Sequence, residues 1–100
     1  MDTLLSINLI ATNPGIRNGR PHIVGTTLTV ADIVIAKVYQ MMDVDGIADH
    51  YNLPLQAVHA ALAFYYEHKA EIDDSIRERR KLAEEMKEKR VGSRHKPLFG

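Results

Sequence analysis

The sequence predicts a mainly α-helical fold of the helix-turn-helix type, with a small β-hairpin in front and a charged helical tail behind. Three observations support this class. Two short β-compatible stretches flank a turn-rich segment near the start, residues 47–62 carry the residue types of two helices joined by a tight turn, and the last thirty residues are dense in charges of both signs. One hundred residues supply a core for one domain.

The hairpin is predicted from residues 7–11 and 22–24. The first stretch ends at an Asn-Pro-Gly turn signal, and the second stops at Gly25. Two short strands are not stable alone, so they must pack on the helices or pair with another chain. An exposed strand edge here favours a homodimer.

The first helix is predicted over residues 30–42. Thr29 with Asp32 three positions later forms an approximate capping box at its start. Its apolar residues cover more than one stripe, which indicates burial on more than one side. Because the chain is short, we expect a partner subunit to cover the second face, through a dimer interface of Ile33, Ile35, Val38, Tyr39 and Met42.

The helix-turn-helix signal lies in residues 47–62. A short helix ends near Tyr51, Asn52 suits a turn with positive φ, and Pro54 suits the first position of a long helix that runs on through Ile76. Ala48 provides the small residue that two steeply crossing helices need at their contact. These residue types predict the architecture, and function is a separate question.

DNA readers place hydrogen-bonding side chains on the outward side of the second helix. Among the outward positions of this helix, only Gln56 and His59 can form hydrogen bonds to bases, so the alternative is a packing unit with an idle recognition face. Phosphates would be contacted by Arg17, Arg20, Lys37 or the basic residues of the tail. The candidate DNA-binding residues are therefore Arg17, Arg20, Gln56 and His59.

Charge divides the chain into a domain at residues 1–75 and a tail at residues 76–100. Residues 1–70 contain four basic and six acidic side chains, whereas residues 71–100 contain nine basic and seven acidic ones. The tail is interpreted as a solvated helix or as a disordered segment that orders on a partner. The candidate partner-binding residues are Ile72, Ile76, Arg77 and Arg80.

Composition argues against several functional classes. The formal net charge is zero, so no overall field favours nucleic acid or an anionic membrane, and the lack of Cys removes disulfides and thiolate catalysis. The five His residues lack metal-ligand spacing, and no nucleophile elbow or phosphate loop occurs. We therefore expect neither enzyme activity, nor a metal, nor a cofactor. Without a basic leader or an 18-residue apolar run, we expect a cytoplasmic protein that does not enter a membrane.

The motifs from residue 13 to about residue 74 resemble the domain-of-unknown-function family 433, an antitoxin-like group sometimes placed with VapB-type antitoxins. The resemblance is carried by Asn13-Pro14-Gly15-Ile16-Arg17-Asn18-Gly19-Arg20-Pro21-His22-Ile23-Val24-Gly25-Thr26-Thr27-Leu28-Thr29-Val30, then by Ile47-Ala48-Asp49-His50-Tyr51 with Leu53, and then by Val58, Ala60-Ala61-Leu62-Ala63 and Tyr65-Tyr66. The chain departs from the family pattern at Val24, where a basic residue is usual, and at Thr27, where Arg is usual.

The resemblance implies a β-hairpin followed by a homeodomain-like three-helix bundle, a homodimer, and the antitoxin role in a toxin-antitoxin system. Such an antitoxin would bind a PIN-like ribonuclease and repress its own operon by binding operator DNA. Two alternatives stay open: a DNA-binding transcriptional regulator without a toxin partner, and a dimeric scaffold domain.

Overall fold

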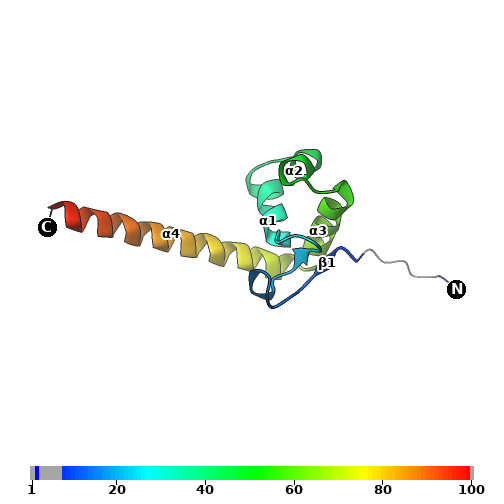
Figure 1. Ribbon diagram of the computed structural model, residues 1–100, viewed down its shortest axis with the longest axis horizontal. Helices are drawn as coiled ribbons and strands as arrows, with labels where there is room; N and C mark the ends of the chain where they lie inside the picture. The colour runs from blue at the N-terminus through cyan, green and yellow to red at the C-terminus, as the bar shows by residue number, and fades with distance from the viewer. Residues whose placement is uncertain (1, 3–7, 100) are drawn as a thin grey trace.

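The structure is a computed structural model that describes residues 2 and 8–99, with side chains through residue 88. Figure 1 shows a compact group of short elements from which one long helix, α4, projects. The described part extends over 74 × 27 × 23 Å because of this helix. The fold is mainly helical with a small two-stranded hairpin near the N-terminus, as the sequence predicts.

The hairpin consists of β1 (Ile10–Ala11) and β2 (His22–Ile23), which pair antiparallel with Ile10 opposite Ile23. A 3-10 turn, η1 (Arg17–Gly19), lies in the connecting loop. Both strands are shorter than predicted, and residue 7 of the first predicted stretch lies outside the described residues. Strands this short are held in place by packing, and both contact helix α3.

Helix α1 (Val30–Val34) begins at the predicted capping box. The Thr29 hydroxyl accepts a hydrogen bond from the Asp32 N–H at 3.1 Å, and the Asp32 carboxylate accepts one from the Thr29 N–H at 2.9 Å. The predicted single helix over residues 30–42 is too long. After Val34 the chain forms a π-helical segment, η2 (Ile35–Tyr39), and the backbone then leaves the helix at Met41, where φ is +59°.

The helix-turn-helix arrangement is formed by α2 (Val44–Tyr51) and α3 (Leu55–Glu67). The Asp43 side chain caps α2 by accepting a hydrogen bond from the Gly46 N–H at 2.7 Å. Asn52 ends this helix in the left-handed conformation with φ of +54°, as its residue type predicts. Pro54 lies just before the first residue of α3, one position earlier than expected.

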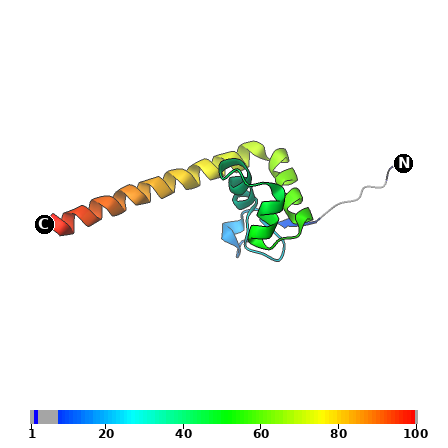
Figure 2. The same cartoon turned by 90° about the horizontal axis from the view of Figure 1, so that it is seen from above.

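The prediction of one long helix that runs through Ile76 is wrong, because the chain turns at His68. Here φ and ψ are −125° and +36°, and a second helix, α4 (Lys69–Phe99), begins. Figure 2 shows α3 and α4 meeting at a steep angle. Neither Pro nor Gly lies at the turn. The turn brings Ile72 and Ile76 back against the core, which a straight helix would carry them away from.

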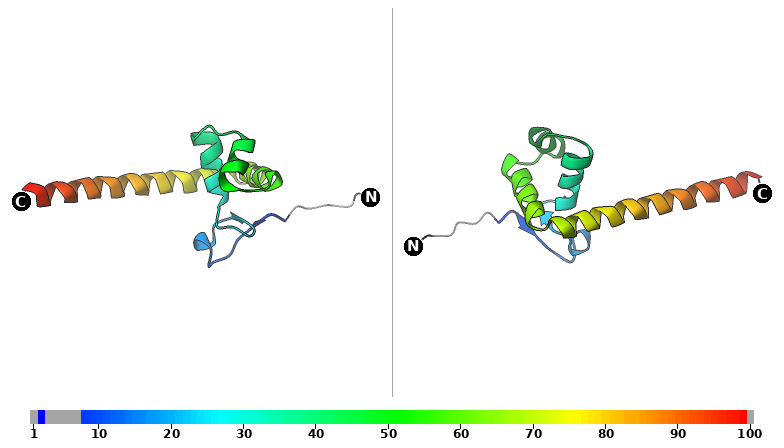
Figure 3. Two further views of the ribbon diagram at one scale, coloured as in Figure 1. Left: turned by 45° about the horizontal axis from the view of Figure 1, so that its top comes forward. Right: turned by 180° about the vertical axis from the view of Figure 1, so that it is seen from behind.

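The core lies between the hairpin and the four helices. Its fully buried side chains of largest volume come from α1, α2, α3 and α4, which contact one another in several pairs. The right-hand view of Figure 3 shows the first turns of α4 against the rest of the fold. The largest of the fully buried side chains are those of Ile33, Ile47, Ile76, Val30, Val34, Val58 and Thr29.

The packed part of the chain extends past the expected boundary at residue 75. Ile76 is 0% exposed, Arg79 forms an ion pair with α1, and the Arg80 guanidinium lies 4.8 Å from the centre of the Tyr39 ring. The globular part therefore ends near residue 80. Within the described residues, no helix is long and apolar enough to cross a membrane.

Candidate binding surfaces

Asp32 connects three separate parts of the chain. Besides capping α1, its carboxylate accepts from Arg17 of the hairpin loop at 3.0 Å and from Arg79 of α4 at 2.9 Å. The same Arg17 guanidinium also donates to the Thr27 carbonyl at 3.2 Å. The loop, the start of α1 and the root of α4 are thereby joined at one carboxylate.

The environment of Asp32 favours its charged form. Burial by itself raises the pKa of this carboxyl, but the Thr29 N–H and the two guanidinium groups oppose burial and together hold the pKa below its usual value. Nη1 of Arg79 is buried and has no hydrogen-bond partner. Because Arg79 remains charged, losing its bond to Asp32 would leave a partly buried cation unpaired.

A second group of polar side chains sets the start of α4. The Tyr65 hydroxyl of α3 donates to Asp73 of α4 at 2.7 Å, and Lys69 forms an ion pair with the same carboxylate at 2.9 Å. Burial and the neighbouring carboxylate raise the pKa of Tyr65, while the hydrogen bonds from Lys69 and Tyr65 lower that of Asp73. His68 stacks on Phe64 with ring centroids 4.1 Å apart. These contacts bridge the turn between α3 and α4.

Beyond residue 80, α4 leaves the globular part and presents an amphipathic surface. Leu82 and Met86 lie one helical turn apart and are 57% and 58% exposed, whereas residues 81–88 otherwise consist of Lys, Glu and one Ala. An apolar pair on such a helix is the kind of surface that a helix-in-groove partner covers.

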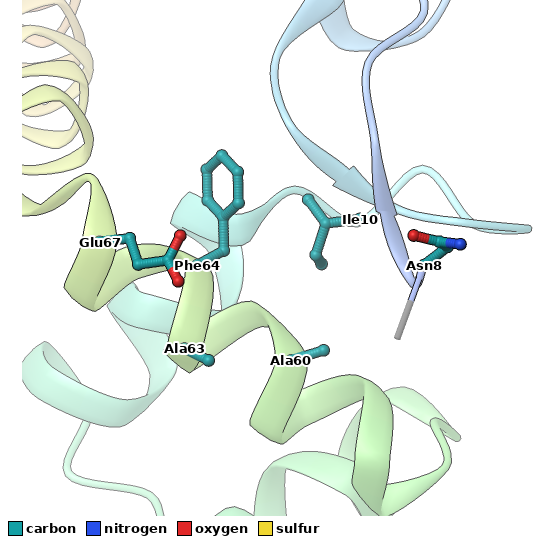
Figure 4. Close-up of a pocket in the computed structure, with 6 residues that line it drawn as sticks. All are labelled: Asn8, Ile10, Ala60, Ala63, Phe64 and Glu67. Carbon is teal, nitrogen blue, oxygen red and sulfur yellow. The ribbon is translucent and has the colours of Figure 1, made fainter. Parts of the chain in front are cut away.

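The outward face of α3 is small, weakly polar and acidic at one end. Gln56 and His59 are exposed as predicted, and Ala63, Tyr66 and Glu67 complete the exposed positions on the same side. Against this face lies a hollow of about 260 Å³ that β1 borders, shown in Figure 4. Its lining residues are Asn8, Ile10, Ala60, Ala63, Phe64 and Glu67.

The structure does not bring the four predicted DNA-binding residues together on one positively charged surface. Arg17 is paired with Asp32, while Arg20 borders a separate groove of about 180 Å³ beside Glu71 and Ser75 of α4. The face that carries Gln56 and His59 has Glu67 as its only charged exposed residue. A face whose charged exposed residue is acidic, and which exposes no Lys or Arg, does not match the phosphate backbone.

The predicted dimer residues divide into two groups. Ile33 is 0% exposed and lies in the core of its own chain, and Ile35 and Met42 pack against that core. Ile33 is therefore unavailable to a second subunit in this fold. Val38 and Tyr39 are exposed at the end of η2, where Arg80 lies over the Tyr39 ring.

The predicted partner-binding residues also divide. Ile72 and Ile76 are buried against the chain's own core, since the turn at His68 folds the start of α4 back onto α1. They cannot contact a partner while this packing is kept. Arg77 forms an ion pair with Asp74 on the surface, and Arg80 is exposed.

The sequence indicates Arg79 as one of several basic tail residues that could contact phosphate, not as a partner of Asp32, and it indicates no role for the Tyr65–Asp73 contact. The spacing of Ile72, Ile76 and Arg79, four residues and then three, would have placed Arg79 on the buried face of α4. No local pattern indicates that its partner lies 47 residues earlier. In the part of the chain that the structure describes, no group of three or more His, Asp or Glu side chains is placed to hold a metal ion.

More than half of the chain matches the model of a known protein family. The model of a family described as a protein of unknown function, DUF433, matches residues 10–65, which is more than half of the chain. The matched region includes the hairpin, α1, α2 and most of α3. No curated protein and no solved structure matches the chain.

Proposed function

The chain belongs to the DUF433 family of proteins of unknown function, and we propose that it is a binding module whose projecting helix docks a partner protein. The observation that supports this proposal is the exposed Leu82 and Met86 pair on a helix that the globular part anchors but does not cover. Catalysis is not part of the proposal, since nothing in the sequence favours it.

The contacts at the start of α4 fix the direction in which the helix projects. Ile72 and Ile76 are buried in the core, and Arg79 is tied to Asp32, so the helix leaves the globular part in a fixed direction. A fixed direction reduces the ordering entropy that a partner would otherwise have to overcome. The binding residues that we propose are Leu82 and Met86, with Arg80 at the border, in place of Ile72 and Ile76.

We propose further that the module acts as the antitoxin of a toxin-antitoxin pair in the cytoplasm, with a PIN-like ribonuclease as its partner. The support for this narrower role is the family resemblance together with a surface suited to masking another protein. Such a complex requires that the chain reduce the activity of the ribonuclease when it binds.

The experiment is affinity capture of the tagged full chain from its own cells after nuclease treatment, followed by a ribonuclease assay on the captured protein. We expect a small ribonuclease in stoichiometric amount that is inhibited by the purified chain. The variant carrying Leu82→Glu and Met86→Glu should lose both capture and inhibition.

Leu55→Glu is the matched control, because Leu55 is an exposed leucine on α3, away from the projecting helix. It should capture the partner as well as the original chain does. Equal capture by the Leu82→Glu, Met86→Glu variant would contradict the docking surface. Capture of a protein that has no ribonuclease activity would contradict the antitoxin role alone.

DNA binding is the second candidate, favoured by the helix-turn-helix arrangement and the exposure of Gln56 and His59 on the first turns of α3. Those turns are where helix-turn-helix proteins contact base edges. In this case, binding to upstream DNA of its own gene should weaken linearly with salt in a log–log plot and be lost in Gln56→Ala. Absence of binding at low salt contradicts it.

A further inference from the structure

Among the described residues, β2 is the strand that pairs with β1, and the outer edge of β1 has no strand beside it. In the β1–β2 register, the Val24 N–H bonds to the Leu9 carbonyl, so Leu9 and Ala11 direct their backbone groups toward β2. By the alternation of antiparallel pairs, the N–H and C=O of Ile10 point the other way. The far edge of β2 is already occupied, since the Ile23 N–H donates to the Leu28 carbonyl.

This edge lies beside the hollow on α3. Ala60 and Ala63 leave the space open, and Ile10 and Phe64 line it with apolar surface, as Figure 4 shows. Its volume of about 260 Å³ is below the range of pockets that enclose a small-molecule ligand. The hollow therefore suits side chains of another protein surface.

We propose that the occupant of this surface is a second copy of the chain, joined by pairing of β1 with β1 of the partner and of α3 with its counterpart. Antiparallel pairing of two edge strands is a two-fold arrangement about an axis perpendicular to the sheet. It keeps both α3 helices on the same side of the enlarged sheet, where they meet.

The residues of the exposed α3 face are complementary under this two-fold relation. His59, Ala63 and Glu67 follow one another at intervals of one helical turn, so antiparallel helices that cross at Ala63 place each His59 level with Glu67 of the partner subunit. An imidazole N–H donates to a carboxylate in that arrangement. The small side chains at Ala60 and Ala63 allow the helices to approach closely.

The proposed interface differs from the one predicted from the sequence. It uses the face of α3 that a DNA reader would use, and it leaves Leu82 and Met86 of α4 exposed. It is thus independent of the docking function proposed above, and each can fail without the other.

The first test is site-specific cross-linking. The chain contains no Cys, so any disulfide must form through the introduced residue. Ala63→Cys lies on the proposed axis and should form an intermolecular disulfide under mild oxidation. Ala83→Cys is the matched control, because Ala83 is also an exposed helical alanine and lies outside the interface, and it should remain monomeric under denaturing conditions.

The second test measures self-association of the full chain by sedimentation equilibrium. His59→Glu places two carboxylates together and should raise the dimer dissociation constant by about tenfold or more. Adding Glu67→Lys to that variant restores opposite charges and should return the constant toward its original value. Circular dichroism confirms that each variant keeps the helical fold.

A two-fold dimer that cross-links at Ala63→Cys and shows the charge rescue supports the proposal. A chain that sediments as a monomer overturns it. A dimer that cross-links through Ala83→Cys instead places the interface elsewhere and also overturns the proposal. So does a dimer whose dissociation constant is unchanged by His59→Glu.

Discussion

Asp32 makes three stabilising contacts in the fold, each with a different residue. It caps α1 through Thr29, holds the hairpin loop through Arg17 and holds the root of α4 through Arg79. Of these three contacts, only the capping box follows from the sequence, because its two residues lie three positions apart. The ion pairs join residues 15 and 47 positions apart, which no local spacing indicates.

We expect Asp32→Asn to lower the free energy of unfolding by about 2 kcal/mol, since it removes the charged acceptor that Arg17 and Arg79 share and leaves the partly buried guanidinium of Arg79 without its ion pair. Urea denaturation of the full chain measures this change. Asp49→Asn, at an exposed position of α2, is the control and should change stability little. Equal effects of the two variants would contradict the joining role of Asp32.

The same carboxylate makes stability depend on pH in a defined direction. Because the folded pKa of Asp32 lies below the usual value of 3.8, its contribution is present above that value and is lost as the pH falls through the lower folded pKa. The stability difference between the original chain and Asp32→Asn should therefore be constant near neutral pH and shrink below 3.8. Denaturation curves at several pH values measure it, and a difference that grows in acid would show the opposite sign.

At the scale of elements, the sequence predicts which segments are helical, but it predicts only some of the helix ends. The caps of α1 and α2 and the left-handed Asn52 are local features, and residue type is sufficient to find them. The turn at His68 is not local. Residues 55–76 read as one helix, and the chain bends there because Ile72 and Ile76 gain burial against α1.

The hydrogen bond from Tyr65 to Asp73 is the polar contact that spans this turn. Tyr65→Phe should lower the thermal midpoint and speed amide hydrogen exchange at the start of α4, because the turn loses the buried donor that fixes it. Tyr66→Phe is the matched control, since the Tyr66 side chain is 69% exposed. If exchange in α4 is unchanged in Tyr65→Phe, apolar packing alone sets the turn.

At the scale of the whole molecule, charge composition predicts a globular part followed by a charged helical tail, but it places the boundary too early. The density of charges rises near residue 71, yet the core continues to Ile76 and the ion pairs to Arg79. A charged residue can be part of the packed structure when its partner comes from another element. A boundary placed from charge composition alone assigns such a residue to the tail.

Two truncations distinguish these boundaries. A chain ending at residue 80 should keep the stability of the full chain, because it retains every contact between α4 and the rest of the fold described above. A chain ending at residue 75 loses Ile76, whose burial is worth about 3 kcal/mol, together with Arg79, and should be largely unfolded. Circular dichroism and urea denaturation compare them. Equal stability of the two truncated chains would place the boundary back at residue 75.

We propose that a partner protein docks on the projecting part of α4. The most direct measurement is amide hydrogen exchange of the full chain, free and in the complex captured from its own cells. We predict slower exchange over residues 81–88 in the complex, with little change in the first turns of α3. Protection confined to α3, with residues 81–88 exchanging as in the free chain, would contradict the claim.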